Sequence, residues 1–229
     1  MKKSAKVKAH CLAVLIIAAL TAQTCPAVSF RDGDFQYWSI NGGSVDIDEN
    51  WTITAHEELR FGDNASEFYY QHTDVGVVYK NVVENVDLGF NFRKAFTKVA
   101  RDNWNSENRP HLNLTIRGEL FDMPVSNRAR LEYRDVDDTK HTYRYRNLFT
   151  VNIPAELTDL KLKPYLADEV FINCDEDGLN INRVYAGLKL KLADNIDGSL
   201  FYLWQTSKPS GSDWGQDINV IGTALKIRF

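Results

Sequence analysis

Apolar and polar residues alternate along almost the whole chain from residue 35 onwards, and this pattern constrains the fold more than any other feature. In Arg109–Leu120, positions 112, 114, 116 and 120 are leucine or isoleucine, whereas histidine, asparagine, threonine and arginine occupy positions between them. A period of two residues is that of a β-strand with two unlike faces. Runs of about ten residues also have the length that a tilted strand needs to cross a bilayer. The sequence therefore predicts an all-β fold made of membrane-spanning strands.

The number of strands follows from counting the alternating runs. The pattern is strong in Trp51–Phe61, Asn85–Phe96, Arg109–Leu120, Val125–Arg134, Thr142–Ile153 and Arg183–Leu192, and weaker in Phe35–Ile47, Phe68–Lys80, Leu160–Asn173, Gly198–Ser207 and Asp217–Phe229. If Asn41-Gly42-Gly43 is a hairpin turn, the first weak run splits and the count is 12; otherwise it is 11. Bacterial single-chain barrels have even strand numbers. We therefore expect a single antiparallel transmembrane β-barrel of about 12 strands, with 10 as the other even number.

The connections between the runs alternate in length. Short connections such as Asp48-Glu49-Asn50 alternate with mostly longer ones such as Thr97–Ser106, Asp135–Lys140 and Cys174–Asn180. Outer-membrane barrels have short periplasmic turns and longer outer loops. No linker or low-complexity tract interrupts the pattern, so we expect one barrel domain over residues 28–229.

The first 27 residues have the pattern of a cleaved signal peptide. Four lysines precede an apolar run from Cys11 to Ala22, and Cys25-Pro26-Ala27 places small residues at the −3 and −1 positions of a cleavage site. An apolar run of about 12 residues is too short to span a bilayer as a helix. An uncleaved anchor and a lipoprotein modified at Cys25 remain as alternatives. Secretion through the inner membrane excludes a cytoplasmic protein.

Composition excludes several classes of function. The whole chain has a net charge of −4, and the loss of the four signal-peptide lysines would make it −8, so we expect no nucleic-acid binding. Cys174 would be the one cysteine left, which leaves no disulfide and no thiolate metal site. No metal or cofactor motif is present, and we predict neither a metal nor a cofactor. The mean hydropathy of −0.36 does not argue against a barrel, because only every second residue of a strand faces lipid.

A soluble barrel also alternates, but its apolar face points inward. Here most strong strands carry several charges or amides on the polar face, and aromatic residues such as Trp51, Phe61 and Tyr143 lie at the ends of the apolar faces. Aromatic girdles at the two interfaces are typical of outer-membrane barrels. The chain also ends in an alternating segment with Phe229 last, which resembles the signal read by the barrel-insertion machinery. We therefore expect the bacterial outer membrane as location, with its lipid and the insertion machinery as partners.

Several segments resemble one known family. They are Phe61–Tyr70 (FGDNASEFYY), Glu107–His111 (ENRPH), Ser126–Arg134 (SNRARLEYR), Tyr143–Arg146 (YRYR), Pro164–Glu169 and Asn182–Gly187. Together they resemble a group of bacterial outer-membrane proteins with a DUF2490-like domain of unknown function, over roughly residues 35–229. The resemblance implies a barrel and a location but no activity. A more distant likeness is to small oligogalacturonate-type porins, which have 12 strands and arginine-lined lumens.

The expected inward face carries an excess of cations and is the candidate site. Its main cations are Arg60, Arg93, Arg109, Arg117, Arg128, Arg130, Arg134, Arg144, Arg146, Arg183 and Lys189, and its acids include Glu58, Asp74, Glu119, Glu132 and Glu169. One interpretation is a small porin whose lumen attracts anionic solutes such as acidic oligosaccharides, because arginine binds carboxylates and phosphates bidentately. The alternative is a non-conducting structural or interaction barrel whose lumen is filled by ion pairs, for example between Glu119 and Arg128 or Arg130.

A lipid-modifying outer-membrane enzyme is a third alternative. Such enzymes resemble one another in having histidine and serine two residues apart, or histidine, serine and an acid near the outer rim. His56, His111 and His141 have no serine two residues away. His72-Thr73-Asp74 could pair a base with an orienting acid, but a suitable nucleophile is not evident. We therefore predict no catalytic residues and no enzymatic activity.

Overall fold

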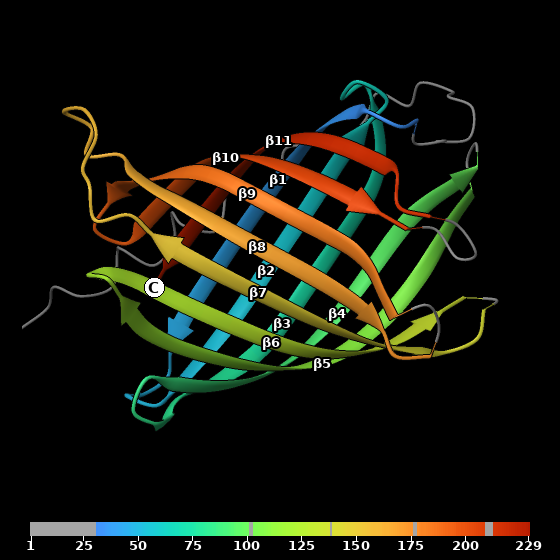
Figure 1. The fold of residues 1–229 in the computed structure, drawn as a ribbon. Helices are drawn as coiled ribbons and strands as arrows, with labels where there is room; N and C mark the ends of the chain where they lie inside the picture. The colour runs from blue at the N-terminus through green and yellow to red at the C-terminus, as the bar shows by residue number, and fades with distance from the viewer. Residues whose placement is uncertain (1–30, 101–102, 138, 176–177, 209–212) are drawn as a thin grey trace, which may run out of the picture.

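A computed structural model describes residues 31–100, 103–137, 139–175, 178–208 and 213–229. The proposed signal peptide lies outside the described residues. The predicted all-β fold is confirmed: the chain forms one closed β-barrel (Figure 1). Its strands are β1 (Asp34–Asp46), β2 (Trp51–Gly62), β3 (Glu67–Val83), β4 (Val86–Ala100), β5 (Asn103–Leu120), β6 (Met123–Val136), β7 (Thr142–Asn152), β8 (Lys163–Asn173), β9 (Gly178–Ala193), β10 (Ile196–Ser207) and β11 (Gln216–Arg228). Within these ranges no helix is long and apolar enough to cross a membrane.

The barrel has eleven strands rather than the expected even number, and this changes how it closes. The segment Asn41–Gly43 forms no hairpin turn, because β1 runs through it from Asp34 to Asp46. With an odd number of strands, the first and the last run in the same direction. The closing pair β1–β11 is therefore parallel, with Asp34 opposite Ile218 and Ser44 opposite Arg228, whereas all other neighbouring strands are antiparallel.

The predicted alternation of short and long connections holds only in part, because residues 153–162, expected to be a short turn, form a long connection between β7 and β8 at the end that otherwise has short turns. We call the end that carries the connections after β1, β3, β5, β7 and β9 the turn end, and the opposite end the loop end. Tight turns with positive φ at Asn85, Phe121 and Asp122 join strands at the turn end, as two-residue hairpins require. At the loop end, the predicted long loop Thr97–Ser106 is wrong, because β4 continues to Ala100 and β5 begins at Asn103. β1 begins at the loop end, and the C-terminus lies at the turn end (Figure 1).

The outer surface of the barrel is apolar and its interior is charged. On β5, the outward-facing side chain of Leu112 is 58% exposed, whereas the inward-facing Arg109 is 4% exposed. On β6, Leu131 is 48% exposed and its neighbour Glu132 is completely buried. This arrangement is the reverse of that in a soluble barrel.

Part of the interior is apolar, which the sequence pattern does not predict. Trp38 of β1, Phe201 and Leu203 of β10, and Ile218 and Val220 of β11 form a buried cluster inside the barrel. Alternation is weak in these strands because both of their faces carry apolar residues. The lumen therefore has one apolar wall around the closing strand pair, and the charged side chains come from the strands opposite and beside it.

Replacing Gly222 with valine is expected to destabilise the barrel by about 1–3 kcal/mol, the usual effect of overpacking. A Cβ atom at Gly222 would lie 2.0 Å from the ring of Phe201, which is buried and in contact with the ring of Tyr185. Urea unfolding of the refolded protein in detergent micelles would measure the loss. Gly118→Val is the matched control, because its Cβ would approach only the side chain of Val125 at 3.9 Å. Equal unfolding midpoints for the two variants would contradict the prediction.

Candidate functional site

The structure places most of the predicted inward cations inside the barrel. Six of them are buried: Arg93, Arg109, Arg130, Arg144, Arg146 and Arg183. Arg60, Arg128 and Arg134 are half-buried. Because alternate residues of a strand face the same side, each arginine lies beside those of the neighbouring strands. Arg130 of β6, for example, is directly opposite Arg146 of β7.

Glu132 of β6 is the centre of the first group of ion pairs. Its carboxylate accepts hydrogen bonds from Arg144 Nε at 2.8 Å and from Arg146 Nη1 at 3.0 Å. Arg130 and Arg109 approach the same carboxylate at 3.6 and 3.9 Å. Four arginines from three strands thus share one fully buried acid.

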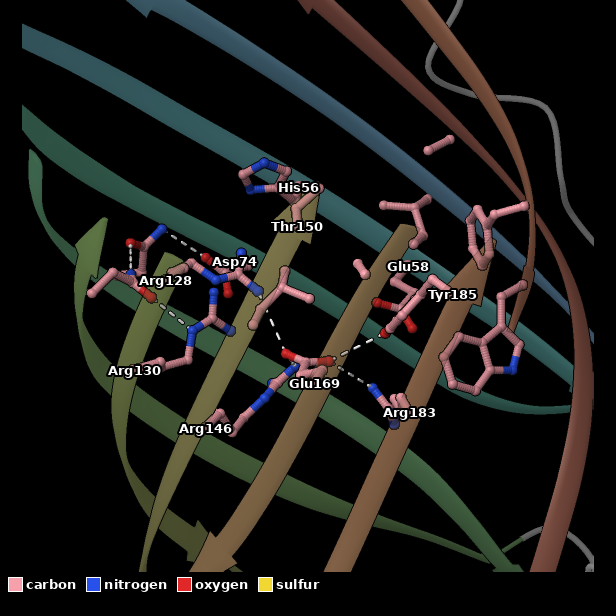
Figure 2. Close-up of a pocket in the computed structure, with 18 of the residues that line it drawn as sticks. His56, Glu58, Asp74, Arg128, Arg130, Arg146, Thr150, Glu169, Arg183 and Tyr185 are labelled. Atoms are coloured by element: carbon pink, nitrogen blue, oxygen red, sulfur yellow. Dashed lines mark hydrogen bonds and ion pairs between the residues drawn. The ribbon is translucent and has the colours of Figure 1, made fainter. Parts of the chain in front are cut away.

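Glu169 of β8 is the centre of the second group (Figure 2). Arg146 Nη2 donates to Glu169 Oε1 at 2.7 Å, the hydroxyl of Tyr185 donates to Oε2 at 3.2 Å, and Arg183 lies 3.5 Å away. Arg128 approaches the carboxylate at 3.6 Å. Arg146 therefore bridges Glu132 and Glu169 and joins the two groups into one network across β6, β7, β8 and β9.

The side of the lumen formed by β2, β3 and β4 contributes two further acids. Asp74 accepts hydrogen bonds from Arg93 Nε at 2.9 Å and from the Asn91 amide at 2.8 Å, and lies 3.5 Å from His111 Nε2. Glu58 pairs with Arg60 at 2.5 Å. The sequence suggested that His72 and Asp74 could pair as a base and an orienting acid. In the structure, His72 lies 3.9 Å from the carboxylate of Glu58, and Asp74 binds Arg93.

Three predicted site residues, Glu119, Arg117 and Lys189, lie outside this network. Glu119 is exposed near the turn end of β5, opposite Pro124, and the expected pairing with Arg128 or Arg130 is wrong because Arg128 is opposite Thr115. Arg117 is also exposed and pairs with Asp87 at the turn end. Alternation along β5 places Arg117 and Glu119 on the face of the strand that points inward. However, this part of β5 extends beyond the region where side chains from opposite walls of the barrel meet.

Lys189 also lies near the turn end, where its ammonium group donates to Asn152 Oδ1 at 2.6 Å.

The predicted inward acids do not include Glu107. Glu107 of β5 is buried and binds Arg109 at 2.7 Å and Arg134 at 2.7 and 3.0 Å. Its side chain points into the barrel, as do those of Arg109 and His111 at alternate positions of the strand, so extending the alternating run by two residues towards the N-terminus would have identified it.

Beyond the loop end of β6, the hydroxyl of Ser106 donates a hydrogen bond to Asp137 and lowers the pKa of that carboxyl group.

Aromatic rings hold the arginines in the middle of the lumen. The guanidinium of Arg60 lies 3.7 Å from the ring centroid of Trp38, and that of Arg183 lies 4.9 Å from it. On the other side, Arg183 and Arg146 lie 4.5 and 4.3 Å from the centroid of Phe171. Arginine stacks favourably on aromatic faces, more so where water is excluded. These contacts fix the arginines across the lumen.

Two neighbouring cavities lie in the middle of the lumen between the described strands and share part of their lining. We call the cavity of about 390 Å³ on the turn side the chamber, and the one on the loop side, of about 250 Å³, the outer cavity. Four arginines line both cavities: Arg60, Arg93, Arg146 and Arg183. We call these four the partition. Among the described residues, no group of three or more histidine, cysteine, aspartate or glutamate side chains could hold a metal ion.

Comparison with known protein families gives a match over most of the chain. Residues 35–216 match the family described as "Protein of unknown function (DUF2490)". The chain belongs to this family. The match runs from the second residue of β1 to the first residue of β11, so it covers β2 to β10 fully and leaves most of the closing strand β11 outside. Neither a curated protein nor a solved structure gives a significant match.

Proposed function

We propose that this member of the DUF2490 family is an outer-membrane β-barrel whose lumen is closed, and that it does not serve as an open diffusion pore. The observation that carries the proposal is the partition, which lies between the two cavities of the lumen. Its arginines come from β2, β4, β7 and β9, and each is bound by a carboxylate. Arg60, Arg146 and Arg183 also stack on aromatic rings. Such a set of charge-assisted contacts fills the middle of a narrow barrel with side chains.

Location in the outer membrane is supported by the two surfaces of the barrel. Exposed leucine, valine, isoleucine and phenylalanine side chains cover the outside, as contact with lipid requires. Aromatic contacts lie at both ends: Trp51 packs on Tyr79 at the turn end, and Phe68 packs on Phe61 and Trp104 at the loop end. The proposed signal peptide would deliver the chain to the inner membrane for export. Phe229, exposed at the turn end, would then be accessible to the insertion machinery.

The alternative of an anion-conducting porin is less well supported by the geometry. An open anion pore needs cations that face a continuous path of water. The arginines of the partition instead face carboxylates at distances of 2.5–3.5 Å. The proposed role is therefore that of a structural or binding barrel, and it includes no catalytic step.

Fractionation followed by bilayer recordings tests the proposal. We expect the full chain to sediment with outer membranes, and the purified protein to show the heat-modifiable gel migration of a folded barrel. In planar bilayers the wild-type protein should then give no discrete conductance steps, because the partition closes the lumen. Recovery from the periplasm or the inner membrane would overturn the location, and regular steps from the folded wild type would overturn the closed lumen.

A further inference from the structure

The chamber on the turn side of the partition has more positive charge than its own acids neutralise. Six arginines line it, against three carboxylates: Arg60, Arg93, Arg128, Arg130, Arg146 and Arg183 against Glu58, Asp74 and Glu169. Glu132, which contacts Arg130 and Arg146, adds a fourth acid. The excess remains, and uncompensated charge is unfavourable in a lumen walled by protein and lipid.

The excess is concentrated on Arg128 and Arg130, which are on the same face of β6. Arg128 has one ion pair, 3.6 Å long, to a carboxylate that Arg146 already binds at 2.7 Å. Its Nε atom is buried and has no hydrogen-bond partner among the described residues. Arg130 donates its Nε to the neutral amide oxygen of Asn113, and its one ion pair among the described residues is with Glu132 at 3.6 Å. Glu132 is shared with three other arginines, and the positive charges of Arg128, Arg146 and Arg93 act on Arg130. Both guanidinium groups line the chamber (Figure 2).

The chamber lies on the turn side of the lumen, next to the mouth of the barrel at the turn end. A larger cavity of about 990 Å³ lies there and shares the lining residues Ser199 and Ala224 with the chamber. Five lysines line this mouth, against three acids: Lys161, Lys163, Lys189, Lys191 and Lys226 against Glu156, Asp159 and Asp197. A concave mouth with one sign of charge in excess raises the local concentration of ions of the opposite sign.

We propose that the chamber binds a small soluble organic anion, which enters from the turn end and places its carboxylate or phosphate group on Arg128 and Arg130. The volume of the chamber is that of a small-molecule site. Hydroxyl groups of Thr54, Thr150, Tyr165 and Ser199 line the same space and suit a hydroxylated ligand. Because the partition closes the far side, the site is a one-sided pocket, and in this respect the inference rests on the proposed function.

Titration of the refolded full chain with glucuronate, and with glucose as the uncharged analogue, tests the inference. At constant ionic strength, calorimetry should detect glucuronate binding and no glucose binding. Arg128→Gln should weaken the binding at least roughly tenfold, since hydrogen bonds to a charged group are lost. Arg117→Gln is the matched control, because Arg117 is also an arginine on the inward-pointing face of its strand but does not line the chamber. Absence of glucuronate binding to the wild type, or an equal loss in both variants, would overturn the inference.

Thermal unfolding without ligand gives a second readout. If Arg128 is held for an anion, its replacement removes like-charge repulsion, and Arg128→Gln should unfold at the same temperature as the wild type or higher. A purely structural arginine would lower the unfolding temperature when replaced, and that result would contradict the inference. These readouts are separate from the conductance that tests the proposed function. A barrel that conducts ions and binds glucuronate would overturn the closed lumen alone. A barrel that gives no conductance steps and does not bind glucuronate would overturn the anion site alone.

Discussion

Glu132→Gln is expected to destabilise the barrel by about 3–5 kcal/mol, the range observed when one partner of a buried ion pair is removed. The carboxylate of Glu132 is completely buried and contacts Arg109, Arg130, Arg144 and Arg146. The glutamine has nearly the same volume, so the packing is kept and the charge alone is lost. The guanidinium of Arg144, whose two nitrogens lie 2.8 and 2.6 Å from the carboxylate, then faces an amide.

Urea unfolding in lipid vesicles, followed by tryptophan fluorescence, would measure this loss. Glu119→Gln is the matched control, because Glu119 is exposed near the turn end of β5 and takes no part in the network. Its free energy of unfolding should stay within about 0.5 kcal/mol of the wild-type value. A Glu132 variant as stable as this control would show that the buried carboxylate does not hold the arginines together.

Replacing Arg146, Glu169 and Arg183 together with serine is expected to open the lumen. Arg146 of β7 and Arg183 of β9 belong to the partition, and Glu169 of β8 binds both of them. The two arginines also cover the ring of Phe171. Removing Glu169 together with Arg146 and Arg183 avoids a buried carboxylate that has lost most of its partners. Serine side chains are too short to span the gap, so the chamber and the outer cavity should join. Planar-bilayer recordings should then show discrete steps that the wild type lacks.

The matched control is the double variant Arg117→Ser/Asp87→Ser, which removes an ion pair near the turn end and should stay as silent as the wild type. In the open triple variant, Arg60, Arg93, Arg128 and Arg130 still line the path. Reversal potentials in a salt gradient should therefore show a preference for anions. A triple variant that is folded yet silent, as judged by heat-modifiable migration, would show that other side chains close the lumen.

The sequence determined the strands and the identity of most of the charged side chains inside the barrel. Alternation from Arg109 to Leu120 is strong because one face meets an apolar surface and the other a polar interior. Where both faces are apolar, as in β10 and β11, the same rule gives little information. The buried positions of Phe201 and Val220 could therefore not be predicted, since their strands carry apolar residues on either side.

The tertiary structure decided how the barrel closes and which charges meet. The sequence leaves open whether Asn41–Gly43 turns, and only the pairing of β1 with both β2 and β11 makes the number of strands odd. Parity along a strand places Glu107 and Glu119 on the same face, but the register with β6 puts Glu107 among arginines and leaves Glu119 exposed. An alternating pattern specifies the direction of a side chain and not its position across the lumen. Whether Arg146 lines an open path or bridges Glu132 and Glu169 depends on the register of β7 with its two neighbours and on how the side chains of the three strands meet inside the closed barrel.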